Sequence, residues 1–513
     1  MSHEAFDRLG RSLSERPDHP MIVPGPAVDH AAVTARELEQ HSQRWAARLR
    51  ARGLRRGERV AVLAEAHPDA VAIMLAILRT GLVHVPINPR YRGPELRHVV
   101  QDCDASVLLC DQALADERLD ALPPGLPRWG IDQGPSLPVL PPPQPLAEPE
   151  AADTPRLDDE TALLVYTSGT TGRSKGVRLS LRTIVGNIGA LTEQWRFGPD
   201  DVLSLSLPLF HVHGLCIGIY GALLHGMTVR LHPRFDPAAV VDDFDRGATV
   251  FMGVPTMYGR LLEHLQAHPE AGPVLGRGRL FTAGSAALRP AVLEAFEEHT
   301  GHRILERYGM SETLITLSNP YEGERRAGAV GRPVPGCEVR VVDEYGADVE
   351  PGHLGELWVR GPYLMQGYWA QPEATAAAFT DGWFRTGDVV QADADGVLRI
   401  VGRRSVDIIK SGGFKISAPE IEEVLREHPA VLEAAVVGVP DARWGERIAA
   451  AVVARPGAEP PTEALTAWVA ERLADYKKPR QLQLVTELPR NALGKIQKPR
   501  LIAALRRPDD PER

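Results

Sequence analysis

Over the first 110 residues, segments with strand-like patterns alternate with segments with helix-like patterns, and this alternation restricts the fold more than any other feature of the sequence. Arg59–Glu65, Leu82–Asn88 and the ASVLLC segment ending at Cys110 are apolar runs of strand length. Ala35–Arg52 and Asp69–Arg79 have apolar residues at helical spacing. Strands separated by helices predict a layered α/β structure with parallel sheet.

The remaining sequence predicts a second α/β run from Thr161 to about Leu317 and then a β-rich part with turn signals. A last block of about 110 residues begins near Arg403, and it is long enough for a small domain of its own. We therefore expect an α/β protein with a large, multi-layered N-terminal domain of α/β and β-rich subdomains at 1–402. A small, mobile α+β C-terminal domain is expected at 403–513, with a hinge at 402–406.

Between the two α/β runs, Leu122–Glu160 is crowded with proline and has no hydrophobic periodicity. Because proline lacks the backbone N–H that a sheet requires, this stretch predicts an extended connector on the surface.

Composition excludes several classes of protein. The 513 residues contain 58 Lys and Arg against 67 Asp and Glu, a net charge of −9, which argues against a nucleic-acid or anionic-membrane binder. None of the four cysteines forms a C-x-x-C pair, so neither a disulfide framework nor a zinc site is indicated. The charged N-terminus is unlike a signal peptide, and the apolar run Ala70–Leu78 is too short to span a bilayer. We expect a cytoplasmic protein without membrane insertion.

The most informative segment is LLVYTSGTTGRSKGV, from Leu163 to Val177. An apolar strand, Ala162–Tyr166, leads into a loop of glycine, serine and threonine that ends at Lys175. Glycines allow close approach of the backbone, hydroxyls donate hydrogen bonds, and the lysine supplies charge, so the loop suits the oxygens of a polyphosphate. It is not a P-loop, because Ser174 and Gly176 flank the lysine where that motif requires Gly and Ser or Thr.

The segment TSGTTGRSKGV resembles the phosphate loop of the adenylate-forming enzymes, which include acyl-CoA synthetases, luciferases and peptide-synthetase adenylation domains. Six further segments resemble motifs of this superfamily, in the superfamily's order and over some 330 residues in all. They are PLFHVHGL (208–215), GSA (284–286), ERYGMSET (306–313), WFRTGD (383–388), VGRRSVDIIKSGGFKI (401–416) and PRNALGK (489–495).

The resemblance implies ATP, Mg²⁺ and CoA as cofactor and co-substrates, and a carboxylic acid as the small-molecule substrate. It implies a nucleotide site made of the phosphate loop and residues from four of the other motifs: Thr167, Ser168, Gly169, Thr170, Thr171, Lys175, Gly284, Ser285, Ala286, Arg307, Tyr308, Gly309, Met310, Ser311, Asp388 and Arg403. Glu312 suits a magnesium ligand, because hard cations take carboxylate and phosphate oxygens. Asp388, which we expect in a Thr-Gly-Asp turn, resembles the acceptor for the ribose hydroxyls, although an aspartate that only caps a turn is also compatible.

The resemblance also implies two half-reactions. The carboxylate attacks the α-phosphate of ATP and releases pyrophosphate, with Lys495 as the catalytic lysine and Thr167 and His211 as further catalytic candidates. The C-terminal domain then rotates, and Ser411, Gly412 and Gly413 line a tunnel through which the CoA thiol reaches the acyl carbon. The charged hinge residue of the family has no clear counterpart here, which leaves Arg404, Ser405 and Val406 as candidates.

The acid is indicated by the Glu-Arg pair before Tyr308, which looks most like that of malonyl-CoA synthetases. Arg307 would place a guanidinium at the acyl pocket, where a second substrate carboxylate needs a cationic partner. Arg307 is alternatively a structural partner of Glu306 or another acid. The other expected acyl-binding residues are His211, His213, Ser285 and Met310.

Three further possibilities stay open at this stage. The substrate could be a short- or medium-chain monocarboxylic acid rather than malonate or methylmalonate, or the acceptor could be a carrier protein rather than free CoA. The context of Lys495 also resembles sites at which a lysine acetyltransferase modifies the catalytic lysine of some family members, and acetylation would remove its charge.

Overall fold

A computed structural model describes residues 4–25, 31–115, 117–131, 160–167, 174–403, 407–411, 414–441, 443–473, 475–490 and 496–507. The chain divides into two compact units. The first unit consists of Met1–Glu338 and Val359–Phe384, and the second of Val339–Trp358 and Arg385–Arg513. The second unit thus takes in β-rich segments that precede the predicted boundary at 402/403, and the predicted domain division stays a prediction.

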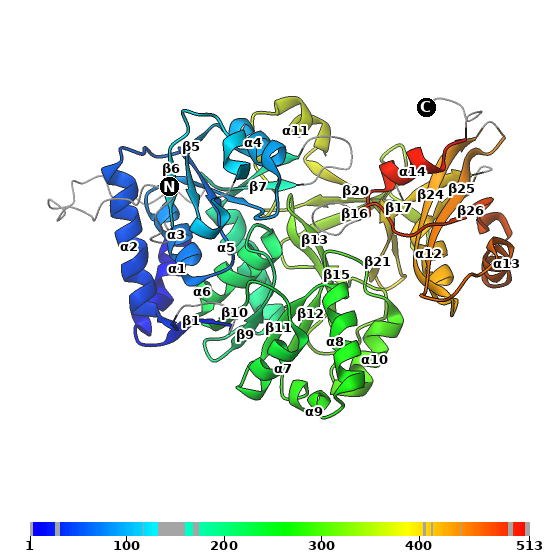
Figure 1. The fold of residues 1–513 in the computed structure, drawn as a ribbon, viewed down its shortest axis with the longest axis horizontal. Helices are drawn as coiled ribbons and strands as arrows, with labels where there is room; N and C mark the ends of the chain where they lie inside the picture. The colour runs from blue at the N-terminus through cyan, green and yellow to red at the C-terminus, as the bar shows by residue number, and fades with distance from the viewer. Residues whose placement is uncertain are drawn as a thin grey trace. The chain divides into compact units, whose positions relative to one another are not determined.

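The first unit contains a sheet that is nine-stranded within the described residues (Figure 1). Its order is β15 (Arg332–Pro333), β14 (Leu314–Ser318), β13 (Leu305–Met310), β12 (Leu280–Ala283), β11 (Val250–Gly253), β9 (Val202–Leu205), β10 (Thr228–Leu231), β1 (Pro20–Pro24) and β2 (Val33–Thr34). The six strands from β13 to β1 are parallel to one another. At the two ends of the sheet, β2 pairs antiparallel with β1, β14 pairs antiparallel with β13, and β15 pairs antiparallel with β14.

A second sheet of the first unit has seven strands in the described part of the chain. Its order is β18 (Gly367–Tyr368), β8 (Lys175–Ser180), β7 (Thr161–Thr167), β4 (Val83–Ile87), β3 (Arg59–Leu63), β5 (Ala105–Cys110) and β6 (Arg128–Gly130). The strands from β7 to β6 are parallel, whereas β8 turns back antiparallel on β7. The predicted parallel α/β architecture is confirmed.

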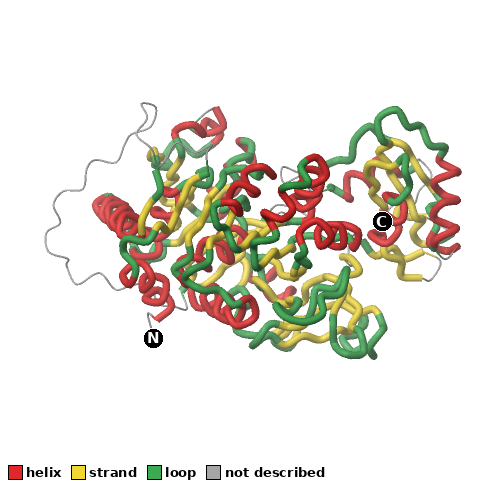
Figure 2. Tube along the Cα trace, turned by 90° about the horizontal axis from the view of Figure 1, so that it is seen from below, coloured by secondary structure: helices red, strands yellow, loops and turns green. Residues whose placement is uncertain are grey.

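Helices cover these sheets, as the tube trace of Figure 2 also shows. They are α1 (Glu4–Glu15), α2 (Ala35–Ala51), α3 (Pro68–Arg79), α4 (Gly93–Asp102), α5 (Leu181–Trp195), α6 (Gly221–His225), α7 (Pro237–Asp245), α8 (Pro255–Ala267), α9 (Ala271–Leu275), α10 (Pro290–Thr300) and α11 (Pro372–Ala378). Short 3-10 turns lie at Gln112–Leu114 and Glu117–Ala121.

Local sequence signals determine where several of these helices begin. Thr34 and Glu37 form a capping box at α2, and Pro68 opens α3.

Aromatic packing fixes the part of the large sheet that carries the candidate site. Phe251 of β11 and Phe281 of β12 pack against Phe244 of α7, Tyr258 of α8 and Phe296 of α10, and all five side chains are buried. Ring centroids 5.1 to 5.6 Å apart join them in stacked and edge-to-face pairs. Helices α7, α8 and α10 therefore form a fixed layer on this sheet (Figure 1).

After the two large sheets come β16 (Glu338–Val342), β17 (Leu354–Arg360), β19 (Phe379–Thr380), β20 (Trp383–Ala392) and β21 (Leu398–Arg403), which form a third sheet. The C-terminal sheet has the order β23 (Phe414–Ser417), β22 (Ile408–Ser411), β25 (Gly445–Ala454) and β24 (Val431–Asp441), and β26 (Gln481–Leu484) pairs with β25. Helices α12 (Ala418–Arg426), α13 (Thr462–Arg472) and α14 (Lys498–Leu505) pack on this sheet, and a 3-10 turn lies at Asp475–Lys477. This α+β block agrees with the predicted composition of the C-terminal part.

Two local predictions were wrong. Within the proline-rich connector, Arg128–Gly130 forms strand β6 beside β5, because its residues include buried Trp129 and no proline. Most of the connector, 132–159, lies outside the described residues. Asp388 lies inside strand β20 rather than in a turn. The preceding residue, Gly387, has a φ of 72°, which glycine adopts without strain, so the strand continues through it.

None of the described helices is long and apolar enough to cross a membrane.

Candidate active site

Three of the sequence motifs follow parallel strands of the nine-stranded sheet. PLFHVHGL comes after β9, the GSA segment comes directly after β12, and YGMSE lies at the end of β13. Because β9, β11, β12 and β13 are parallel neighbours, their carboxyl ends lie on one edge of the sheet. This edge is where open α/β sheets bind their ligands, so the fold brings the three motifs to one site.

Arg307 is the most unusual side chain at this edge. It is 3% exposed, and its Nε and Nη2 atoms have no hydrogen-bond partner in the part of the chain that the structure describes. Burial lowers the pKa of the guanidinium to about 10. A Cβ atom on Gly284 would collide with the guanidinium, so the glycine of the GSA segment provides the space for it. A buried cation without a counter-ion is costly and indicates a missing anion.

The alternative partner of Arg307, Glu306, does not face it. The two residues are adjacent on β13, and successive side chains of a strand point to opposite faces of the sheet. The carboxylate of Glu306 instead accepts a hydrogen bond from the N–H of Leu288 at 3.2 Å. Among the described residues, Arg307 makes no ion pair, so the guanidinium is available to a ligand.

The two histidines of PLFHVHGL lie close enough to interact electrostatically, His213 with Arg307 and His211 with His213. His213 is 5% exposed, and neither of its ring nitrogens has a partner among the described residues. Burial lowers the pKa of His213 well below its usual range, and the charge of Arg307 lowers it further. Burial also lowers the pKa of His211 to about 4. Both shifts favour the neutral imidazole, in which one ring nitrogen can donate a hydrogen bond and the other can accept one.

The backbone after His211 forms a π-helical segment, His213–Tyr220, a rare conformation that is frequent at functional sites. A Cβ on Gly214 would collide with the carbonyl oxygen of Pro208, so glycine is required where the segment folds back on its own start. The histidines are thus held by a tightly packed turn.

Tyr258 is a site residue that the sequence analysis missed. It comes from α8, is fully buried, and donates a hydrogen bond from its hydroxyl to the carbonyl oxygen of Thr282 at 2.9 Å. Burial raises the pKa of Tyr258 well above its usual range, and the charge of Arg307 acts in the opposite direction. No motif marks this tyrosine, since only the packing of α8 on β12 brings it near the guanidinium.

The remaining residues at this edge form the rim of the site. Ser285 and Ala286 are exposed, and Ser285 has a φ of 68°, the left-handed region that non-glycine residues rarely adopt. A Cβ on Gly309 would collide with the carbonyl oxygen of Leu314, where β13 turns into β14. Tyr308 is buried, and Met310 and Ser311 are half-buried.

The phosphate loop connects two strands of the other large sheet. Thr167 ends β7 and Lys175 begins β8, and the two residues are register partners of this antiparallel pair. Ser168, Gly169, Thr170 and Thr171 lie outside the described residues. The ammonium of Lys175 lies 4.8 Å from the ring centre of Tyr368, a second residue that the sequence analysis missed.

Tyr368 joins the phosphate loop to Glu312. Its hydroxyl donates a hydrogen bond to Oε1 of Glu312 at 3.0 Å, and this carboxylate is 6% exposed. Among the described residues, no cluster of three or more His, Cys, Asp or Glu side chains could hold a metal ion. One carboxylate close to Lys175, which the sequence predicts to bind phosphate, fits a magnesium ion that takes most of its ligands from phosphate and water. Such an ion would offset the negative charge of the phosphates.

Asp388 and Arg403 form a pair within the second unit. They are register partners on β20 and β21, and Nε of Arg403 donates to Oδ1 of Asp388 at 2.9 Å. The N–H of Asp388 donates to the hydroxyl of Thr386, which donates to the carbonyl oxygen of Leu357. Buried Glu356, which no motif pointed to, accepts from the N–H of Gly387. This network presents a carboxylate and a guanidinium together.

Of the expected CoA-binding and catalytic residues, Ser411 ends β22 and is 2% exposed, with no partner for its hydroxyl among the described residues. Gly412, Gly413 and Lys495 lie outside the described residues, as do the hinge candidates Arg404, Ser405 and Val406.

Comparison with known protein families matches residues 9–369 to "AMP-binding enzyme" and residues 420–495 to "AMP-binding enzyme C-terminal domain". The chain belongs to the AMP-binding enzyme family. A human relative described as "Malonate--CoA ligase ACSF3, mitochondrial" is 40% identical over 87% of this chain and 83% of its own length. A feruloyl-CoA synthase of an Amycolatopsis species is 37% identical over 92% of this chain and 94% of its own length.

Among solved structures, ATP-bound MatB from Rhodopseudomonas palustris superposes with a TM-score of 0.86 at 36% identity, over 98% of this chain and 99% of that one. Overall identity alone does not separate a malonate ligase from a feruloyl-CoA synthase, because both relatives are similar to this AMP-binding enzyme at nearly the same level. The choice between these acids therefore depends on the residues around Arg307.

The fit of Arg307 against Gly284 leads to a first prediction. Gly284→Ala places a methyl group where the guanidinium lies and forces it to move. We expect kcat/KM for malonate to fall roughly tenfold or more, because a small misplacement of a binding group is costly. Steady-state kinetics with each substrate varied in turn measures this. An unchanged kcat/KM for malonate would contradict it.

Proposed function

We propose that this AMP-binding enzyme is an ATP-dependent acyl-CoA synthetase that forms an acyl-adenylate and then a CoA thioester, with malonate or methylmalonate as the preferred acid. The observation that carries the choice of acid is the buried guanidinium of Arg307, which has no ion pair among the described residues. The human relative named as a malonate–CoA ligase supports this reaction, and the similar ATP-bound MatB structure supports ATP as a substrate.

In the first half-reaction, an oxygen of the substrate carboxylate attacks the α-phosphorus of ATP, and the bond from that phosphorus to pyrophosphate breaks. Two anions must approach each other, so positive charge at the reacting centre lowers the barrier. We assign this role to Lys495, and the binding of the phosphates to Thr167, to the loop 168–171 and to Lys175. Asp388 would accept hydrogen bonds from the ribose hydroxyls, and Arg403 would support it.

In the second half-reaction, the CoA thiol loses its proton and its sulfur attacks the acyl carbon, and AMP leaves with the bonding electron pair. We propose that the C-terminal domain, 403–513, rotates about 404–406 between the two steps. This rotation would withdraw Lys495 and bring Ser411, Gly412 and Gly413 to the pantetheine chain. Such a motion separates two reactions that would compete for the same space.

Malonate has two carboxylates, and only one of them reacts. The second carboxylate would pair with Arg307 and gain charge-assisted hydrogen bonds from Nε and Nη2. The neutral imidazole of His213 has a nitrogen that can donate to the same anion. A monocarboxylic acid offers no partner for the guanidinium, so its binding would leave the buried charge uncompensated.

The test compares release of pyrophosphate and formation of thioester across malonate, methylmalonate, acetate, propionate, octanoate and benzoate. A preference for malonate or methylmalonate supports the proposal. A preference for a monocarboxylic acid would keep the two half-reactions but refute the role of Arg307. Release of pyrophosphate without thioester would identify a carrier protein as the acceptor.

We further propose that acetylation of Lys495 by a lysine acetyltransferase switches off the first half-reaction, because it removes the charge of the ammonium. Mass spectrometry of the native protein is expected to find an acetylated fraction at Lys495, and only unmodified peptide would count against the proposal. The cytoplasmic location also stays a proposal, since the human relative's name places that protein in the mitochondrion.

A further inference from the structure

Lys498 is a buried charged residue at the start of α14. It is 9% exposed, and its ammonium lies 2.5 Å from Oδ1 of Asp407 and 2.8 Å from Oε1 of Glu422. A second cation, Arg426, lies 3.0 Å from the other oxygen of Glu422. This cluster in the second unit therefore contains two cations and two anions, and its formal charges balance. The two carboxylates raise the pKa of Lys498, although burial acts against this.

Asp407 connects this cluster to the candidate nucleotide site. Its Oδ2 accepts the N–H of Arg403 at 3.0 Å, and its own N–H donates to the carbonyl oxygen of Arg403 at 2.7 Å. The side chain of Arg403 in turn pairs with Asp388. A Cβ on Gly402 would lie 2.7 Å from the Cβ of Asp407, so the glycine gives the aspartate its space. Hydrogen bonds and ion pairs thus run continuously from Asp388 to Lys498.

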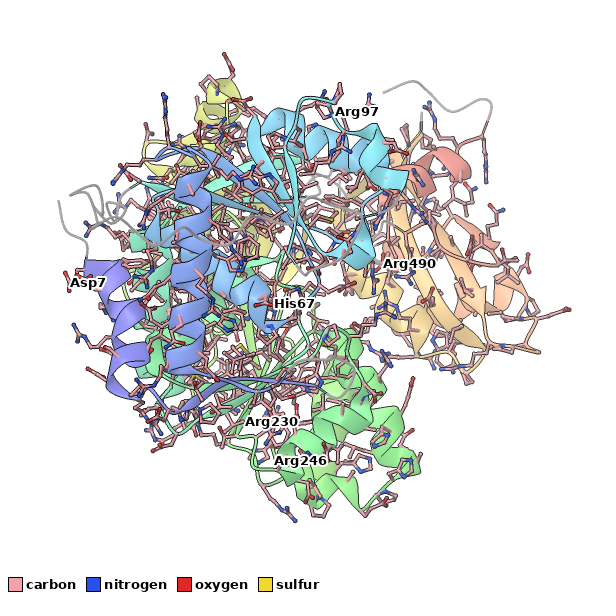
Figure 3. The ribbon with its side chains drawn as sticks, turned by 60° about the vertical axis from the view of Figure 1, so that its left-hand side comes forward. Asp7, His67, Arg97, Arg230, Arg246 and Arg490 are labelled. Atoms are coloured by element: carbon pink, nitrogen blue, oxygen red, sulfur yellow. The ribbon has the colours of Figure 1, made fainter. Side chains whose placement is uncertain are left out.

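Lys498 lies two residues beyond Ile496, and the residues on both sides of the segment 491–495, Arg490 and Ile496, are held by backbone bonds. Arg490 and Ile496 form an antiparallel bridge, and the N–H of Gln497 donates to the carbonyl oxygen of Pro489 at 2.7 Å. Arg490, labelled in Figure 3 beside the strands of the second unit, donates to Glu433 of β24 at 2.6 Å. These backbone bonds hold Ile496 and Gln497, and the ion pairs of Lys498 hold the start of α14, which follows them directly.

The rest of the buried face of α14 is apolar. Leu501 and Leu505 pack with Val437 and Val439 of β24. Apolar packing is non-directional and tolerates a shift of the helix along the sheet, whereas a shift would move the ammonium of Lys498 away from the two carboxylates of its ion pairs. Lys498 is the only charged residue among the buried residues of this helix, so it sets the register of α14.

We propose that Lys498 is a positioning residue for the adenylation half-reaction, holding α14, and with it the end of the segment that carries Lys495, in register with Asp407 and Arg403. This inference rests on the proposed function for its kinetic consequence, but its structural consequence is independent of the reaction.

The test uses Lys498→Met, with Lys477→Met as the matched control. Lys477 also makes a Lys–Glu pair with α12, 2.6 Å from Glu420, but it lies outside α14. Release of pyrophosphate from ATP and malonate reports the first half-reaction, and thioester formation from synthetic malonyl-adenylate and CoA reports the second. We expect Lys498→Met to slow the adenylation half-reaction at least tenfold and the thioester-forming half-reaction less than threefold. The control Lys477→Met is expected to change both rates less than threefold.

Hydrogen exchange of the 496–505 peptide provides a readout that needs no activity. We expect exchange at least tenfold faster in Lys498→Met, and unchanged in Lys477→Met. Because Lys498→Met leaves the carboxylate of Asp407 without a cation, while Glu422 keeps Arg426, the double variant Asp407→Asn with Lys498→Met serves if the single variant does not fold. Equal slowing of both half-reactions, or unchanged exchange, would overturn the proposal. A wild-type protein that adenylates no acid would refute the proposed function, and exchange alone would then decide the role of Lys498.

Discussion

Arg307→Ala is expected to lose at least a hundredfold in kcat/KM for malonate, whereas any activity with a monocarboxylic acid is expected to stay or rise. The guanidinium is buried at the carboxyl edge of the nine-stranded sheet and makes no ion pair among the described residues. Removing a cation that pairs with a desolvated carboxylate leaves that carboxylate unpaired, which costs about 3–5 kcal/mol, equivalent to a hundredfold or more. Steady-state kinetics with each acid measures the effect. Retained use of malonate would contradict it.

The same residue gives an opposite prediction for stability. Burial lowers the pKa of Arg307 from its usual value to about 10 in the folded protein, because burial disfavours the charged form. The penalty is fully present below pH 10 and disappears as the pH rises above 10 toward the usual pKa of a guanidinium. At 1.36 kcal/mol per pKa unit it amounts to roughly 3 kcal/mol near neutral pH. Arg307→Met is therefore expected to raise the free energy of unfolding while abolishing malonate use.

Arg279→Met is the control for this stability effect. Arg279 is a partly buried arginine that is paired, with Nη2 at 2.5 Å from Oδ2 of Asp201. Its replacement leaves a buried carboxylate unpaired and is expected to lower the melting temperature. Thermal unfolding at pH 7.5 without ligands compares the two variants. If both lowered the melting temperature, Arg307 would have an internal partner and its role as a ligand-binding cation would be wrong.

Lys495→Ala is expected to slow the release of pyrophosphate from ATP and malonate by about 10²–10³ or more, the effect of losing one group that stabilises developing charge. Thioester formation from synthetic malonyl-adenylate is expected to stay within threefold of wild type, because the proposed domain rotation would withdraw Lys495 before the thiol attacks. Quenched-flow measurement of each half-reaction separates the two rates.

Lys478→Ala is the matched control for Lys495. Lys478 lies in the same unit and pairs with the exposed carboxylate of Asp475 at 2.7 Å, an interaction that contributes little to stability. The control is expected to leave both half-reactions unchanged. An equal loss in both half-reactions with Lys495→Ala would contradict the assignment of this lysine to adenylation alone.

Much of the fold could be predicted because buried strands and helix starts leave recognisable patterns within single short segments of the sequence. Strands such as Arg59–Leu63 are buried between helical layers and read as unbroken apolar runs, and the helix Ala35–Ala51 has its own capping box. The predicted parallel sheets were confirmed for this reason. The strand at Arg128–Gly130 was missed, since three residues give no periodicity and prolines surround them.

The candidate site could be predicted only where a motif marks it. The sequence placed Arg307 and Gly284 in separate motifs, but only the structure shows the guanidinium over the glycine and Glu306 on the other face. Tyr368 and Tyr258 reach the site through tertiary packing that no spacing encodes.

The central claim is that a buried cation at the carboxyl edge of the sheet selects a second carboxylate. The most direct test is CoA-thioester formation by the wild-type protein with ATP and Mg²⁺, with malonate, methylmalonate, acetate, propionate, octanoate and benzoate compared at equal concentration. We expect malonate or methylmalonate to be preferred at least a hundredfold over each monocarboxylic acid. Equal or faster reaction with any monocarboxylic acid would contradict the claim.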